Sequence, residues 1–302
     1  MSAIRIAWLP IVICVPIALS GCVNLESPPP TSQSRRVVIN FTNQELSAWS
    51  DIPMGAYRIP NSQVIVSGYQ EGGVNFGTIH GIVTVAPTVS GGTQEIAAVK
   101  SSQQALQISL TTLAPAVLHT LLESTFSAKY TLEQDPSAPV LSIGGDIVLM
   151  FENESRVRPF VVLNATLTEP HGSRVTWAMR YTASIGAPRA LTGDGSWTAD
   201  GGAALQTVVL LEMQRALAVM LTDVSSPFVR DRHAKTTAQG YFPFIKGRFQ
   251  VIGYLLGEDA DSIVFVPDVP STSMLHGVQV MDKSITIYRA ASADDPRMKS
   301  LN

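Results

Sequence analysis

The middle of the chain alternates hydrophobic and polar residues with a period of two, which is typical of half-buried β-strands. The clearest example gives one strand a hydrophobic face made of Val175, Trp177, Met179 and Tyr181. The same pattern predicts strands at 129–134, 140–152, 156–168 and 174–185. A turn signal, Glu169 to Ser173, separates the last two, so we expect an antiparallel hairpin with one buried face.

Two other segments have apolar residues three and four positions apart, as an amphipathic helix requires. Residues 93–126 are predicted to be helical in two pieces, with Pro115 as a kink or a new start. Residues 203–223 predict a long helix that is apolar over much of its circumference. Its exposed side is expected to be a narrow stripe of Glu212, Arg215 and Thr222.

Strands are also predicted on both sides of this central part. Two lie near the N-terminus, at 35–41 and 63–69. Short strands with tight turns follow at 236–244, 248–257, 261–267, 276–281 and 284–288. We therefore expect an α+β protein with an antiparallel sheet and helices packed on one face, followed by a small all-β, barrel-like C-terminal domain.

The start of the chain has the organisation of a secretory signal peptide. Arg5 precedes an uncharged apolar run, Ile6 to Leu19, which Pro10 and Pro16 interrupt and which is short for a membrane span. The run ends in Leu19-Ser20-Gly21-Cys22, which resembles the lipobox of bacterial lipoproteins. The resemblance implies cleavage between Gly21 and Cys22 and a lipid on the Cys22 thiol. The alternative is an ordinary secretory signal with a cysteine there by chance.

These features divide the chain into consecutive parts. They are a signal peptide 1–21, a Pro/Ser-rich tether 22–34, an α+β domain 35–228, a small β domain 229–290 and a disordered tail 291–302. Cys14 leaves with the signal peptide, so the mature protein keeps Cys22 alone and has no disulfide. Val23 follows Cys22, and the resemblance to lipoproteins without Asp at this position implies the periplasmic face of the outer membrane. Inner-membrane anchoring remains an alternative.

Charge argues against nucleic acid as a partner. Loss of residues 1–21 removes Arg5 and no acidic residue, which leaves 20 basic and 24 acidic side chains and a net charge of −4. The charges are spread evenly, without a basic block. Only 15% of the residues are charged and 45% are hydrophobic, as in a well-packed globular protein.

One segment, residues 72–92, contains no charged side chain and has glycine pairs at both ends. We expect a loop of small residues or a short buried helix here. Because exposed apolar patches mark interaction sites, this segment is the candidate contact surface for a protein partner. The residues that we assign to it are Phe76, Gly77, Ile79, Gly81 and Ile82.

No motif for catalysis, metal or a cofactor stands out. The histidines are scattered, a Gly-x-Ser-x-Gly turn is absent, and Asp194 and Asp200 lack the spacing of a known calcium loop. Glu152 and Glu154, followed by Arg156 and Arg158, are interpreted as a solvated strand edge. The sequence therefore predicts no catalytic residue, no metal ligand and no cofactor.

The order of elements is loosely similar to that of periplasmic assembly and transport-accessory lipoproteins, a similarity of architecture that transfers no residue roles. The leading hypothesis is a lipid-anchored envelope protein that binds a protein partner as an accessory subunit of a transport or assembly complex. One alternative is a periplasmic hydrolase that uses Ser196 or a carboxylate pair with a histidine. Another is a glycan-binding lipoprotein that stacks sugars on Trp177 or Trp197.

Overall fold

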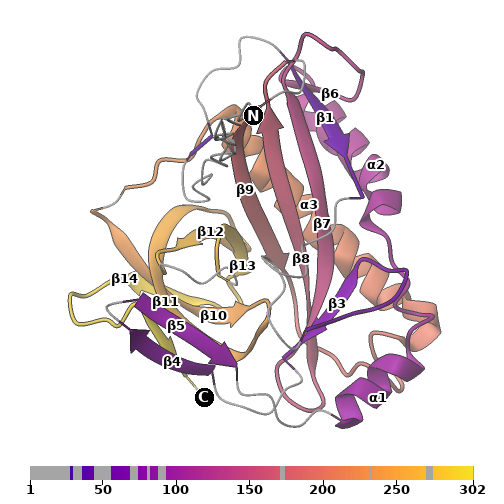
Figure 1. Ribbon diagram of the computed structural model, residues 1–302, viewed down its shortest axis with the longest axis vertical. Coiled ribbons are helices and arrows are strands. Elements are labelled where there is room, and N and C mark those ends of the chain that lie inside the picture. The colour runs from indigo at the N-terminus through magenta and orange to yellow at the C-terminus, as the bar shows by residue number, and fades with distance from the viewer. Residues whose placement is uncertain are drawn as a thin grey trace, which may run out of the picture.

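A computed structural model describes most of the chain after the tether. The described residues are 28–29, 36–43, 56–68, 74–79, 82–87, 93–170, 174–231, 233–269 and 275–301. Gly21, Cys22 and Gly81 lie outside them, as do the predicted signal peptide and most of the tether. Figure 1 shows a tall central sheet with helices behind it and a curled group of strands at one side.

Thirteen of the described strands belong to one sheet, whose main path runs β14-β10-β11-β12-β13-β9-β8-β7-β1-β6. The strands before the long helix are β1 (Val37–Phe41), β2 (Tyr57–Arg58), β3 (Val64–Ser67), β6 (Tyr130–Thr131), β7 (Val140–Phe151), β8 (Val157–Thr168) and β9 (Val175–Ser184). The strands after it are β10 (Lys235–Phe242), β11 (Ile245–Glu258), β12 (Ser262–Pro267), β13 (Val278–Asp282), β14 (Ile287–Ala290) and β15 (Met298–Ser300).

The antiparallel meander β7–β8–β9 is the centre of the sheet, and its strands match the predicted ones closely. Alternation along β8 sends Val161 and Leu163 into the main core and Phe160 and Val162 to the opposite face. Both faces are buried here, which explains why β7 and β8 have nearly continuous apolar sequences. However, β1 and β3 pair with β7 in parallel, so the sheet is mixed and the fully antiparallel sheet we predicted is wrong.

The helices are α1 (Thr93–Ser101), α2 (Leu110–Leu121) and α3 (Ala203–Ser225). A π-helical turn, Leu122–Phe126, continues α2. Helix α3 contacts β8, β9 and α2, and α2 contacts β7 and β1. Pro115 does not mark a new start, because it lies inside α2, and the break between the two helical pieces falls between Ser101 and Leu110. Two residues within this break, Leu106 and Ile108, are buried in the core and hold the connection against the sheet.

The rotation of α3 about its axis also differs from the expectation. Glu212, predicted to be exposed, is fully buried, whereas Leu211 is 49% exposed. The inward side carries Leu205, Val209, Met213, Leu217 and Leu221. Glu212 lies three residues beyond Val209, so it falls on the same side of the helix.

The strands after α3 extend the same sheet. β13 pairs with β9 in parallel, through four residue pairs that include Gln279 and Thr182. A separate barrel is therefore not what the structure shows, although these strands enclose a hydrophobic cluster of their own around Phe242, Phe249 and Phe265. Parallel pairing of two strands requires a long connection, here α3 with the β10–β12 strands, and local sequence patterns do not reveal such a pairing. A domain boundary at residue 229 stays a prediction.

Two further segments differ from their predictions. Residues 298–300, within the tail predicted to be disordered, form β15 and pair with β11. An ion pair between Arg289 and Asp295 helps to hold the preceding turn. Residues 74–79 and 82–87, predicted as a loop or short helix, form the antiparallel strands β4 (Val74–Ile79) and β5 (Ile82–Pro87). Their β-branched residues, seven of the twelve, favour strands over helix.

The close packing of β7 on β8 predicts a severe effect of Gly145→Ala. A Cβ atom at Gly145 would lie 2.1 Å from the Val162 carbonyl oxygen, so the two strands would have to move apart. We expect a loss of about 1–3 kcal/mol in the free energy of unfolding, measured by urea titration with tryptophan fluorescence.

The matched control is Gly257→Ala in β11, where the added carbon would lie 3.9 Å from Phe228 Cε1, an ordinary van der Waals contact. This variant is expected to remain within about 0.5 kcal/mol of the unmodified protein. Equal stability of the two variants would contradict the observed register of β7 on β8.

Candidate functional site

The residues predicted to contact a partner lie together in the structure as far as it describes them. Phe76, Gly77 and Ile79 belong to β4, and Ile82 is the first residue of β5. In the hairpin, Phe76 pairs with Val85 and Ile79 pairs with Ile82. The predicted set is therefore one β-hairpin, which the sequence analysis did not foresee.

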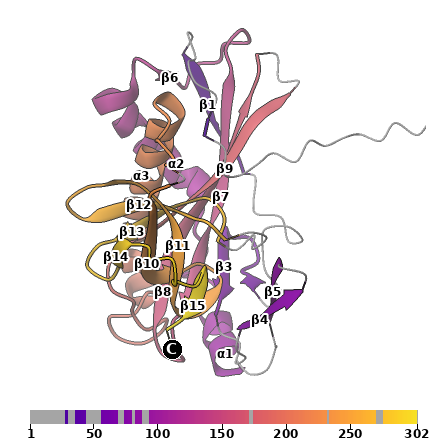
Figure 2. The ribbon, with the colours of Figure 1, turned by 90° about the vertical axis from the view of Figure 1, so that its left-hand side faces the viewer.

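This hairpin forms a sheet of its own. In the part of the chain that the structure describes, β4 and β5 pair with each other and with no strand of the large sheet. Figure 2 shows the hairpin on the side of the central sheet opposite α2 and α3. Each strand thus has an edge of backbone N–H and C=O groups without a strand partner among the described residues, and such an edge can pair with another chain.

A second candidate site lies at the turn that ends β9, where four elements converge on the backbone of Ile185 and Gly186. The Ile185 N–H donates to Oε1 of Glu212 from α3 at 3.1 Å. The Gly186 N–H donates to Oδ2 of Asp282 at the end of β13 at 2.9 Å. Nη1 of Arg158 from β8 donates to the Gly186 carbonyl at 2.5 Å. Gly186 has a φ of 79°, a conformation that favours glycine.

Arg158 connects this turn to the hairpin between β7 and β8. Its Nε donates to Oε1 of Glu152 at 2.5 Å, and its guanidinium carbon lies 4.9 Å from the centre of the Tyr241 ring. The Arg158 side chain is only 2% exposed and that of Glu152 is 9% exposed. The interpretation of these residues as a solvated strand edge was therefore wrong for Glu152 and Arg158, whereas Glu154 and Arg156 are exposed.

The two acids at the turn have opposite pKa shifts. Burial raises the pKa of Glu212 well above its ordinary value, against the opposing effects of the Ile185 N–H and Arg158, and so favours the neutral carboxyl. Burial also raises the pKa of Asp282, but hydrogen bonds from Ser284 and Gly186 and the charge of Arg215 outweigh it, and the net shift is downward. Paired acids with diverging pKa values occur in acid–base catalysis, but they also occur in structural ion-pair networks.

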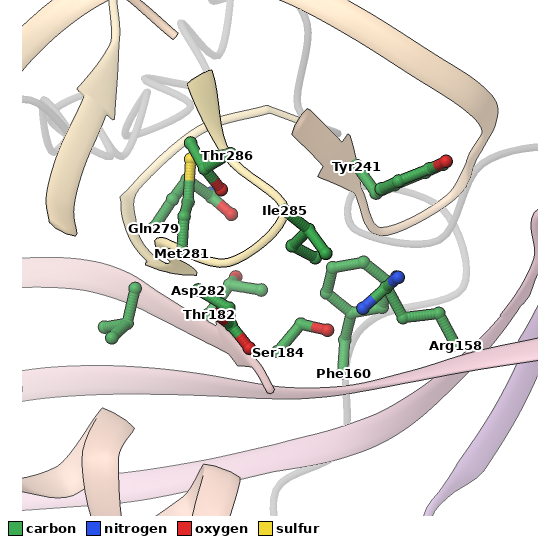
Figure 3. Close-up of a pocket in the computed structure, with 11 residues that line it drawn as sticks. Arg158, Phe160, Thr182, Ser184, Tyr241, Gln279, Met281, Asp282, Ile285 and Thr286 are labelled. Atoms are coloured by element: carbon green, nitrogen blue, oxygen red, sulfur yellow. The ribbon is translucent and has the colours of Figure 1, made fainter. Parts of the chain in front are cut away.

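The size of the cavity next to this turn bears on whether the two acids could act in catalysis or belong to a structural ion-pair network. Figure 3 shows Arg158, Phe160 and Tyr241 at one end of it and Gln279, Met281 and Thr286 at the other. Its volume is about 10 Å³, which is room for one water molecule and far less than a substrate needs. Thr182 Oγ1 and Gln279 Nε2 are buried without a hydrogen-bond partner, and a water molecule between them would satisfy both. The buried contacts at this cavity join strands and leave no room for a substrate. A wider, open depression of about 470 Å³ adjoins the same turn and is lined by residues that include Ile185, Arg215 and Asp282.

Within the described residues, Ser196 is not hydrogen-bonded to a histidine, as the hydrolase alternative requires. Ser196 is 1% exposed, and its Oγ has no hydrogen-bond partner, so it lacks a general base. His119 Nδ1 lies 3.2 Å from Glu123 Oε2 on the exposed side of α2, and His233 is exposed. His80 and His171 lie outside the described residues.

The glycan-binding alternative fails on burial, because the Trp177 and Trp197 rings are each only 2% exposed. The Trp197 indole N–H donates to the Val157 carbonyl inside the core. Neither ring is available to stack on a sugar. Within the described ranges, no three His, Cys, Asp or Glu side chains gather to hold a metal ion.

Comparisons with known proteins add little. No family model matches the chain, and there is no significant match among curated proteins. One similar solved structure is the crystal structure of protein XCC0632 from Xanthomonas campestris, described by the family designation DUF330. The identity is 14% and the TM-score is 0.27, over 67% of this chain and 89% of that chain. A likeness at this level carries no argument about function.

The buried Glu212 predicts a pH-dependent stability that Glu212→Gln removes. In the unfolded chain the carboxyl titrates near its ordinary pKa of 4.5, and in the folded protein its pKa is higher. Below pH 4 the carboxyl is neutral in both states and its burial carries no ionisation penalty. As the pH rises above the unfolded pKa, the unfolded state ionises and stability is lost, by at most about 1.4 kcal/mol per pH unit.

Urea unfolding at pH 4 and pH 7.5 measures this difference. Glu212→Gln should be more stable than the unmodified protein at pH 7.5 and close to it at pH 4. The exposed Glu123 provides the control Glu123→Gln, for which we expect little change in the difference between the two pH values. A Glu212→Gln variant that is less stable at pH 7.5 would show that the buried carboxylate is ionised.

Proposed function

We propose that this protein is a lipid-anchored envelope protein that binds a protein partner as an accessory subunit of a transport or assembly complex. The anchor is the lipid on Cys22, which the lipobox-like Leu19-Ser20-Gly21-Cys22 supports. The proposed location is the periplasmic face of the outer membrane, with inner-membrane anchoring as the alternative. The Pro/Ser-rich tether, 22–34, holds the folded part away from the lipid surface.

The observation that carries the partner proposal is the β4–β5 hairpin. Residues 72–92 carry no charge, and the strands they contain have no pairing with the large sheet in the described part of the chain. Natural proteins usually protect such edges with lysine, proline or covering elements. The hairpin ends at Pro87 but has no charged residue to discourage pairing.

Strand addition is the binding mode that suits this hairpin. An extended segment of a partner forms main-chain hydrogen bonds with the free edge of a strand, and side chains on alternate positions provide specificity. A partner of this kind needs no deep cavity, and the described cavity beside the main sheet is too small for a ligand. Phe76, Gly77, Ile79, Gly81 and Ile82 are the proposed contact residues.

Replacement of the anchor residue tests the first part of the proposal. For this test, residues 22–302 follow an ordinary secretory signal peptide with its own cleavage site, because a lipobox without its cysteine is neither lipidated nor cleaved. Cys22→Ala in this form should keep its fold, because Cys22 precedes the sheet, and should be found in the soluble periplasmic fraction instead of the membrane fraction. Cell fractionation with immunoblotting measures this, and circular dichroism of the purified variant checks the fold. If Cys22→Ala stayed with the membranes, the lipid would not be the sole anchor, and the apolar segment 72–92 would become the suspected second contact.

Photo-crosslinking in cells tests the partner proposal. A photoreactive side chain at Phe76 or Ile82 should give one discrete crosslinked product, because a partner strand that pairs with the hairpin lies in direct contact with residues at these positions. The controls are Leu132 and Val175, which are 43% and 45% exposed and lie outside the hairpin. The product should contain the same protein from both hairpin positions by mass spectrometry. Crosslinks that were absent at Phe76 and Ile82, or equally strong at the controls, would refute the proposal.

A further inference from the structure

The β4–β5 hairpin has two edges, and the register of its strands shows which backbone groups each edge offers. Ile79 pairs with Ile82, and two residues separate them in the chain. In a hairpin with a two-residue connection, the pair that flanks the connection exchanges main-chain hydrogen bonds. Hydrogen-bonded and non-hydrogen-bonded pairs then alternate along the antiparallel strands. The pairing of Ile79 with Ile82 therefore assigns every other pair of the hairpin.

Every second residue of each strand has main-chain groups that point away from the other strand. These residues form the non-hydrogen-bonded pairs, so their N–H and C=O groups are directed to the outer edges of the hairpin. On β4 they are Val74, Phe76 and Thr78, which pair with Pro87, Val85 and Val83 on β5.

The two edges are not equivalent. All three outward residues of β4 have both an N–H donor and a C=O acceptor. On β5, Pro87 has no N–H, and proline at the edge of a sheet hinders the addition of another strand. Apart from each other, β4 and β5 have no more than isolated contacts with the described helices and strands, so none of these elements packs along the edge of β4. The β4 edge is therefore complete and accessible to another strand.

We propose that the extended segment of the partner pairs with β4, alongside Val74 to Thr78, and that β5 becomes the outer strand of the resulting three-stranded sheet. This inference rests on the proposed function, in which the hairpin binds a partner by strand addition. The outward donors and acceptors of β4 recur at every second residue, about 7 Å apart. Another extended main chain has the same repeat and can satisfy all of them in one register. Because β4 has no charged residue, the recognised chemistry is the backbone of an extended protein segment and not a charged group.

Proline substitutions within one cross-strand pair test the choice of edge. Thr78 and Val83 pair with each other, so a proline at either position removes an outward N–H and leaves the hydrogen bonds between β4 and β5 in place. The photoreactive residue is placed at Ile82 of the full chain in cells. Thr78→Pro should lower the yield of the crosslinked partner about tenfold, because one hydrogen bond is lost and a partner group is left unpaired. Val83→Pro should keep the yield within about twofold of the unmodified protein.

Two controls separate the edge from the side chain and from the hairpin itself. Thr78→Ala removes most of the side chain but keeps the N–H, so its yield should match that of the unmodified protein. A disulfide between Phe76→Cys and Val85→Cys reports the hairpin, since residues of a non-hydrogen-bonded pair have Cα atoms about 4.5 Å apart, within the range of a disulfide. It should form in the unmodified background and in both proline variants. Its absence from the unmodified background would overturn the register on which the choice of edge depends.

Val74→Pro is a second β4 variant, at the first residue of the strand, where proline is tolerated. It also removes an outward N–H and should lower the yield. If Thr78→Pro prevented the disulfide, the yield of Val74→Pro would decide, and an undiminished yield would overturn the inference.

The remaining outcomes distinguish the choice of edge from the proposed function. Equal yields from Thr78→Pro and Val83→Pro, or a larger loss from Val83→Pro, would overturn the assignment to β4 and leave the proposed function standing. The absence of any crosslinked product from the unmodified hairpin would refute the proposed function itself, and the inference with it.

Discussion

Four residue pairs between β9 and β13 hold the two groups of strands in one sheet, and much of the remaining structure depends on this parallel ladder. The turn at its end is fixed by side chains from three elements, β13, α3 and β8. Asp282 accepts from the Gly186 N–H, Glu212 accepts from the Ile185 N–H, and Arg158 donates to the Gly186 carbonyl. Hydrogen bonds to buried backbone groups are costly to lose, so these contacts keep the ladder in register.

The same contacts determine which side of α3 faces outward. Because Glu212 must reach the Ile185 N–H, the helix is rotated so that an acid enters the core and Leu211 faces out. Burial raises the pKa of the Glu212 carboxyl and favours its neutral form, which lowers the cost of its position in the core. One buried hydrogen bond thus links the stability of the sheet to an uncharged outer helix surface. A simple amphipathic helix would have presented that acid to solvent.

The protein offers surfaces and little interior space for binding. The cavity between β9, β13 and the Tyr241 strand has room for about one water molecule, and Ser196, Trp177 and Trp197 are buried. The β4–β5 hairpin carries no charged residue and pairs with no strand of the large sheet in the described part of the chain. Figure 2 shows it on the side of the central sheet opposite α2 and α3.

The sequence by itself determined the central elements, because their signals are local. The period-two pattern of β7, β8 and β9 and the long apolar helix α3 arise from residues that lie next to one another in the chain. The lipobox-like end of the leader is likewise a local motif. The position of Glu212 was also readable, since it lies three residues beyond Val209 and four before Ala216, both of which are buried.

Tertiary structure decided the rest. The parallel pairings of β1, β3 and β13 and the pairing of β15 with β11 join separate segments of the chain. The hairpin at 74–87 resolves a segment whose sequence pattern was ambiguous. A pattern read along the sequence does not contain these contacts. The environment of a side chain depends on those pairings. The sequence pattern alone therefore placed Arg158 and Glu152 in solvent, whereas the structure buries both side chains.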